Sequence, residues 1–130
     1  MLLTRAFLRI IIFFQVRTEY LSKNFESLDL ELAVQLCCLE IRRYYKDMPG
    51  VALDKRSNFD YIEKDVGLHN FIPRLVIEGN KPKALRKLIQ TGFKRCANFG
   101  ERECMVKFFD VLKQVYRYDQ ERFRCALGVS

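Results

Sequence analysis

From Leu30 to Met48, apolar side chains recur every three or four residues, and this spacing most constrains the fold. One stripe consists of Leu30, Ala33, Val34, Cys37, Ile41, Tyr44, Tyr45 and Met48. A second apolar face, formed by Leu32, Leu36 and Leu39, lies on the first half of the same segment. A helix that is apolar nearly all round has to be enclosed by other helices. We therefore expect a long helix at the centre of a bundle, ended by Pro49 and Gly50.

The remaining patterns also favour helices. Phe13, Val16, Tyr20, Leu21 and Phe25 suit a helix, although a strand over residues 8–14 is an alternative. Two helix starts are indicated by an N-cap at Ser27, with acids at Asp29 and Glu31, and by a capping box at residues 57–60. The capping box precedes a short helix with Phe59, Ile62 and Val66 that ends at Gly67. A helix over residues 82–98 buries Leu85, Leu88, Ile89, Phe93 and Cys96, and a last helix from Glu101 carries Cys104, Phe108, Leu112 and Val115. Residues 123–127 resemble the start of a strand. The predicted fold class is all-α.

The start of the chain is apolar but does not suit a membrane span. Arg9 and Arg17 leave only seven uncharged residues between them, whereas a span needs about 20. No small-residue cleavage site follows the apolar run, so we interpret it as a segment buried by the fold or by a partner.

Cysteine and histidine usage gives no support for catalysis or metal binding. The five cysteines are Cys37, Cys38, Cys96, Cys104 and Cys125, none in a Cys-x-x-Cys pair, and His69 is the only histidine. This pattern favours reduced, half-buried thiols in the cytosol over a zinc site or a disulfide framework. Cys96 follows two basic residues, but its spacing puts it on a buried face. We predict no catalytic residue, no metal and no cofactor.

A run of 22 residues between Glu78 and Glu101 contains no acid, and it carries +6 of the formal net charge of +7. Its basic residues are Lys81, Lys83, Arg86, Lys87, Lys94 and Arg95. Pro82 suits the first position of a helix, so the first four charges crowd a helix start that is already partly positive. This arrangement indicates an anionic partner. The alternative is a solvated face of an amphipathic helix.

Three segments closely resemble the helical middle lobe of the FERM domain in the focal adhesion kinase family. They are CCLEIRRYYKDMPGVALDKRSNFDYIEKDVGL, KPKALRKLIQ and ECMVKFFDVLKQVYRYDQERFRCALG. The resemblance implies an all-α bundle of the acyl-CoA-binding-protein type over residues 13–122. Residues 1–12 would be a divergent segment, and residues 123–130 the truncated start of the following lobe. The chain would then be a fragment of a non-receptor tyrosine kinase, without the catalytic motifs of a kinase.

The resemblance also implies two sites. Lys81, Lys83, Arg86 and Lys87 match a basic patch that binds phosphoinositide headgroups and acidic or phosphorylated receptor tails. The positions that pack on the kinase domain and hold it inactive are matched by Tyr45, Met48, Asn58, Tyr61 and Ile62, with Tyr61 departing from an aliphatic residue. From the sequence alone, Tyr45 and Met48 extend a core stripe. The implied location is cytoplasmic, peripheral at the plasma membrane and at cell adhesions, in integrin signalling.

Two other functions remain open. The sequence pI of about 9.3 suits a small helical nucleic-acid binder, but the basic helix lacks exposed aromatic residues for base stacking, and no helix-turn-helix or zinc-finger signature is present. The implied architecture raises an acyl-CoA carrier or an enzyme, although fold alone does not carry function.

Overall fold

The computed structural model describes residues 5–22 and 29–115, and all regular structure within them is helical. The α-helices are α1 (Arg5–Ser22), α2 (Leu30–Tyr44), α3 (Arg56–Asp60), α4 (Arg74–Glu78), α5 (Pro82–Arg95) and α6 (Glu101–Val115). Short 3-10 helices cover Ala52–Asp54 and Leu68–Asn70, and a π-helix covers Tyr61–Gly67. The predicted all-α class is confirmed for this part of the chain. The proposed N-cap Ser27 and the strand over residues 123–127 lie outside it.

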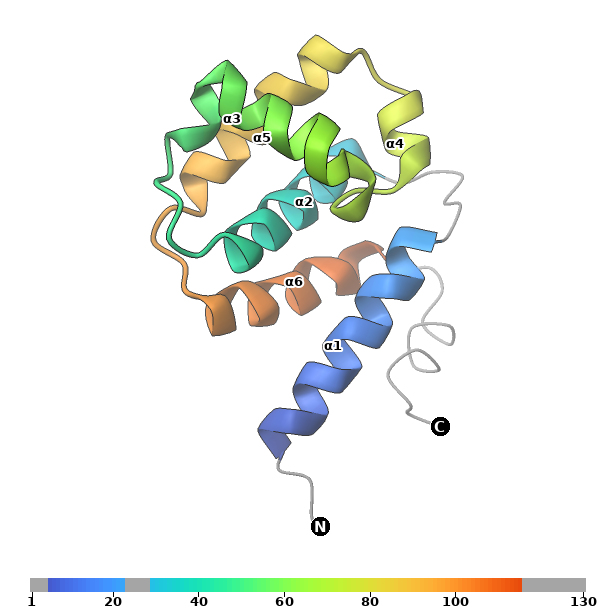
Figure 1. The fold of residues 1–130 in the computed structure, drawn as a ribbon. Coiled ribbons are helices and arrows are strands. Elements are labelled where there is room, and N and C mark those ends of the chain that lie inside the picture. Colours follow the sequence, from blue (N-terminus) through green and yellow to red (C-terminus); the bar gives the residue numbers. More distant parts are fainter. Residues whose placement is uncertain (1–4, 23–28, 116–130) are drawn as a thin grey trace.

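Helix α2 lies between α5 and α6, as its two apolar faces predict (Figure 1). Asp29 caps its start by accepting a hydrogen bond from the Glu31 amide at 2.8 Å. Ala33, Leu36, Cys37, Cys38 and Ile41 are fully buried. The helix ends at Tyr44 rather than Met48, and the chain continues as turns in which the Met48 amide donates to the Tyr45 carbonyl at 3.1 Å.

Helix α1 crosses the bundle beside α2 and α6, and its first turns project beyond them (Figure 1). Phe13, Val16 and Tyr20 are fully buried, and the Phe13 ring meets that of Phe108 edge-on at 5.2 Å. The helical interpretation of this segment is therefore confirmed, and the alternative strand over residues 8–14 is wrong. Burial by this lobe is incomplete, because Leu8, Ile10 and Phe14 are exposed.

A buried carboxylate fixes α1 on α2. The Glu40 side chain is 2% exposed and forms ion pairs with Arg17 of α1 and with Arg43, whose Nε lies 2.9 Å from Glu40 Oε1. Arg17 also donates to the Asn70 carbonyl at 2.6 Å. The Arg43 guanidinium lies 5.0 Å from the centre of the Phe13 ring. Glu40 thus joins α1, α2 and the Leu68–Asn70 turn through charged hydrogen bonds.

The segment after α2 differs most from the prediction. The capping box is wrong, because α3 begins at Arg56 and its N-cap, Lys55, makes no side-chain hydrogen bond. The predicted short helix is α-helical only to Asp60 and then widens to a π-helix, which ends at Gly67 as expected, with φ of 100°. A Cβ at Gly67 would lie 2.6 Å from the His69 ring, so glycine is required there.

The four described cysteines, Cys37, Cys38, Cys96 and Cys104, are buried and free. Desolvation by burial raises the pKa of each thiol, and that of Cys104 reaches about 11. Nearby cations oppose the effect without reversing it: Arg95 lowers the pKa of Cys38, and Arg42 and then Lys107 lower that of Cys96. These thiols stay protonated at neutral pH and are poor nucleophiles.

We predict that Glu40→Gln destabilises the fold by roughly 3–5 kcal/mol, because Arg17 and Arg43 lose their shared counter-charge in a buried setting. Urea unfolding at neutral pH measures the loss. The control is Glu31→Gln on the exposed surface of the same helix, where a few tenths of a kcal/mol are expected. Equal losses in both variants would contradict a structural role for the Glu40 network.

We predict that stability falls as pH rises above about 8.5, where thiols of the unfolded chain ionise while the buried thiols keep their protons. The unfolded state then binds fewer protons, and each thiol lowers the free energy of unfolding by about 1.4 kcal/mol per pH unit. Urea unfolding between about pH 8 and pH 10 measures this slope. Cys104→Ala should have a shallower slope than the parent chain, whatever its stability at neutral pH, and an unchanged slope would refute the assignment.

Candidate anion-docking surface

The first turn of α5 leaves its backbone amides without a side-chain cap. Lys81 is an extended N-cap with φ of −67° and ψ of 132°, and no side chain caps the helix. Pro82 occupies the first helical position, and the Leu85 amide donates to the Lys81 carbonyl at 3.0 Å. The free amides of the first turn therefore face outward with the basic side chains around them.

The buried side of α5 determines which residues face solvent. Leu85, Ile89 and Phe93 point into the core, with at most 3% exposure. The opposite surface carries the basic patch, which we define as Lys81, Lys83, Arg86 and Lys87. Lys81, Lys83 and Lys87 are exposed, and Arg86 is half-buried. Leu88 was predicted on the buried face, but it is 43% exposed.

No residue of the basic patch forms an ion pair with another residue in the described part of the chain. Lys83 and Lys87, four residues apart, lie on the same side of the helix and repel each other. Each cation near the helix start also opposes the helix dipole, at a cost of about 0.3–1 kcal/mol at low ionic strength. A bound anion would relieve both effects.

The two basic residues at the end of α5 have other surroundings. The Lys94 ammonium pairs with Asp54 at 2.8 Å, which neutralises it. Arg95 faces a separate groove next to α2. Four of the six cations of this run, those of the basic patch, therefore lie together at the start of α5 without an ion pair among the described residues.

The residues matched to a kinase-domain interface lie around the turn after α2. Tyr45 and Met48 are half-buried at the edge of the core, and Tyr61 is 48% exposed. Partial burial raises the pKa of Tyr45, and the neighbouring Tyr61 and Tyr44 raise it further. The three tyrosines thus form one cluster, which we call the aromatic turn together with Met48.

Two of the predicted interface residues have internal roles. Asn58 is half-buried, and its amide donates to the Ala52 carbonyl at 2.9 Å, which holds the preceding turn. Ile62 is fully buried in the core, so its side chain is not available to a partner. The prediction of Ile62 as a contact residue is therefore corrected.

Tyr44 was assigned to the core stripe by its spacing, but its side chain is 63% exposed. Its ring lies 5.0 Å from that of Tyr45 and 6.2 Å from that of Phe71. The apolar stripe of α2 turns away from the core by the last turn of the helix. The same spacing therefore places residues in the core at the start of the helix and on the surface at its end. No signal in the sequence separates the two.

Within the described residues, no group of three or more His, Cys, Asp or Glu is arranged to hold a metal ion. His69 lies on the exposed turn after Gly67. The same part of the chain contains no helix with the length and hydrophobicity of a bilayer span.

The family model for the FERM central domain matches residues 2–123, nearly the whole chain. Its all-α, acyl-CoA-binding-like lobe agrees with the helical bundle in Figure 1. The match begins inside the segment of residues 1–12 that was predicted to be divergent.

Proposed function

Because the chain belongs to the FERM central domain family, a family of non-catalytic modules that generally bind membrane lipids and receptor tails, we propose that it docks on anionic phosphoinositide surfaces through its basic patch. Within the family, we propose that the chain belongs to the focal adhesion kinase branch, which the resemblance of its three sequence segments supports. It would act at the cytoplasmic face of the plasma membrane, at adhesions. Acidic or phosphorylated receptor tails are the competing ligands for the same patch.

The observation that carries this proposal is the crowding of four cations without ion pairs around the uncapped start of α5. Each Lys or Arg near an anionic membrane contributes about 1 kcal/mol. Four of them give a weak, reversible attachment that falls with increasing salt. A partly buried arginine among exposed lysines also supplies a planar donor group suited to phosphate.

We predict that Lys83→Ala/Arg86→Ala/Lys87→Ala abolishes co-sedimentation with vesicles containing phosphatidylinositol bisphosphate. The same variant should unfold at an equal or higher urea concentration, because cations that oppose the helix dipole are removed. This combination separates lost binding from lost folding. The control, Lys46→Ala/Lys55→Ala/Lys64→Ala, removes the same charge from exposed positions elsewhere and should retain most of the binding.

Unchanged co-sedimentation of the patch variant would exclude the lipid proposal. If an acidic phosphopeptide binds the parent chain and the vesicles do not, the receptor-tail alternative is favoured. Tight binding of a DNA duplex at physiological salt, lost in the same variant, would favour the nucleic-acid alternative.

We also propose that the aromatic turn packs on the kinase domain of a parent tyrosine kinase and restrains it. Exposed tyrosines next to a methionine favour this, since aromatic and methionine side chains are enriched at the centres of interfaces. Tyr45 is anchored from within, because the buried Arg42 donates to its carbonyl at 2.7 Å. A fixed turn with exposed rings loses little conformational entropy on binding.

We predict that Tyr45→Ala/Met48→Ala prevents this chain from inhibiting a focal adhesion kinase catalytic domain added in trans. Initial rates of peptide phosphorylation measure the effect, with Lys46→Ala as the control in the same turn. The parent chain should lower the rate in proportion to its concentration. If it has no effect, or if the variant inhibits equally, the aromatic turn is not the contact surface.

A further inference from the structure

Exposed apolar side chains gather on the first half of α1. Leu8 and Phe14 are 43% exposed and Ile10 is 42% exposed. Within residues 5–22 and 29–115, no other helix exposes more than one large hydrophobic side chain. We call these three residues the apolar face of α1. Neither the basic patch nor the aromatic turn includes it.

The apolar face points away from the bundle. At about 100° per residue, Leu8, Ile10 and Phe14 fall within an arc of about 160°, centred opposite the core-facing side chains of the same helix. Gln15 and Thr18 continue this side of the helix, and both are exposed and polar. The first turns of α1 also project beyond the other helices (Figure 1). The apolar face is therefore a short, convex surface at the free end of a helix.

The charge at this end of α1 is positive only. Arg5 and Arg9 are exposed, and the sequence contains no acid before Glu19. Neither arginine forms an ion pair with another described residue, whereas Arg17 is neutralised by Glu40. By helical spacing, Arg5 and Arg9 lie on the side opposite the apolar face. An apolar surface backed by unpaired cations favours a partner that is both apolar and anionic.

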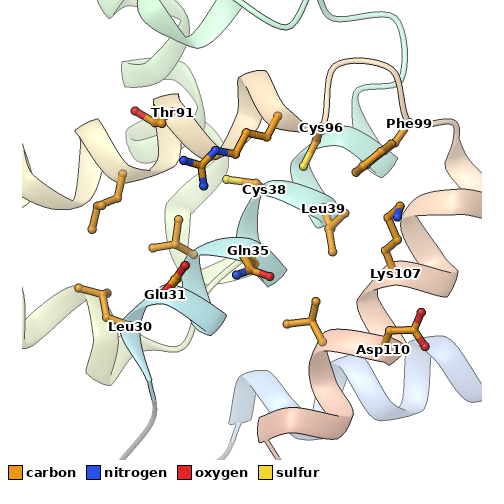
Figure 2. A pocket seen from close by; sticks show the side chains of 15 residues that line it. Leu30, Glu31, Gln35, Cys38, Leu39, Thr91, Cys96, Phe99, Lys107 and Asp110 are labelled. Atoms are coloured by element: carbon orange, nitrogen blue, oxygen red, sulfur yellow. The ribbon is translucent and has the colours of Figure 1, made fainter.

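The groove between α2, α5 and α6 has no such imbalance. Its volume is about 680 Å³, and its lining includes the cations Arg95 and Lys107 and the acids Glu31 and Asp110. Figure 2 shows Lys107 and Asp110 on the same helix. Two acids balance two cations, so the groove gives no preference for a charged ligand.

We propose that the apolar face of α1 lies in the interface of an anionic phospholipid bilayer, with its three side chains among the acyl chains and Arg5 and Arg9 among the headgroup phosphates. Interfacial helices combine an apolar face with arginine or lysine on the polar side, and they bury the apolar face by about 5–10 Å. The bundle lies on the other side of α1, where Phe13 and Tyr20 are buried, so it leaves this approach open.

A second copy of the chain fits the apolar face less well. Two copies packed through the same surface would bring their arginines together, because a symmetric contact pairs each patch with itself. No acid precedes Glu19 in either copy to offset this charge. Anionic headgroups neutralise it instead, and they attract cations near the membrane surface.

This contact does not rest on the proposed docking of phosphoinositides. A different helix carries it, and its main contribution is the burial of apolar side chains rather than the pairing of charges. Either surface can therefore fail without the other.

The test uses tryptophan as a reporter, since the chain contains none. In Leu8→Trp and Ile10→Trp, we expect emission at shorter wavelength with vesicles that contain phosphatidylserine and no phosphoinositide. Lipids brominated on their acyl chains should quench this emission. The matched control is Val51→Trp, which replaces an exposed apolar side chain outside α1 and should show neither effect.

Two further variants separate the apolar and the charged contributions. Leu8→Gln/Ile10→Gln should weaken binding to these vesicles about tenfold or more, because the burial of two aliphatic side chains is lost. Its urea midpoint should be unchanged, since both positions are exposed. Arg5→Gln/Arg9→Gln should weaken binding at low salt and have less effect at high salt.

The basic-patch substitutions Lys83→Ala/Arg86→Ala/Lys87→Ala, introduced into the Leu8→Trp chain, should leave the quenching at saturating lipid in place. The proposal is overturned if brominated lipid does not quench Leu8→Trp, or if it quenches Val51→Trp equally. It is also overturned if the chain forms dimers in sedimentation equilibrium that Leu8→Gln/Ile10→Gln disperses, because the apolar face would then belong to a second copy.

Discussion

The buried carboxylate of Glu40 is the interaction on which the arrangement of the helices depends. It lies on the central helix and draws Arg17 of α1 and Arg43 of α2 to the same place. A carboxylate that is 2% exposed has lost its hydration, so it is stable there only while both guanidinium groups donate to it. Because Arg17 also binds the Asn70 carbonyl, the same group fixes the turn before α4. Apolar packing alone would let α1 rotate or slide on α2, whereas charged hydrogen bonds define one position.

The rotation of α5 about its own axis decides which of its side chains face the core and which face solvent. Contact between Gly92 and Cys38 brings α5 close to α2 and directs Leu85, Ile89 and Phe93 inward. The lysines at the helix start then have to face solvent, and Arg95 has to face the groove. A larger residue at position 92 would separate the helices and change the groove first. The basic patch would change less, because it lies more than one turn away.

The parts of this fold that follow local rules were predictable, and those set by distant partners were not. The apolar spacing of α2 and the proline at the start of α5 identified both helices and the four outward cations. Spacing gives the direction of an apolar face but not its width, so Leu88 and Tyr44 were assigned to the core although both are exposed. The pairing of Glu40 with Arg43 follows a local i,i+3 spacing, but its pairing with Arg17 has no local signal, because Arg17 is 23 residues away. Among the candidate interface residues, Ile62 was chosen by resemblance alone. Its burial in the structure shows that it belongs to the core and is not exposed to a partner.

Helix α5 connects the basic patch to the aromatic turn. The contacts along this connection favour direct competition between a membrane and a kinase domain over a motion transmitted from one surface to the other. Gln90 donates to the Leu53 carbonyl at 2.8 Å, and Lys94 pairs with Asp54, so α5 is attached to the turn that follows the aromatic turn. Transmission of a lipid signal along this route would need an element with two stable arrangements. The structure shows one arrangement, held by a hydrogen bond from the Gln90 side chain to a backbone carbonyl and by an ion pair. A membrane bound at the basic patch would therefore act on a bound kinase domain by occupying space and by its charge. Such a ligand favours the state in which the kinase domain is released only to the extent that the bound kinase domain prevents the ligand from binding.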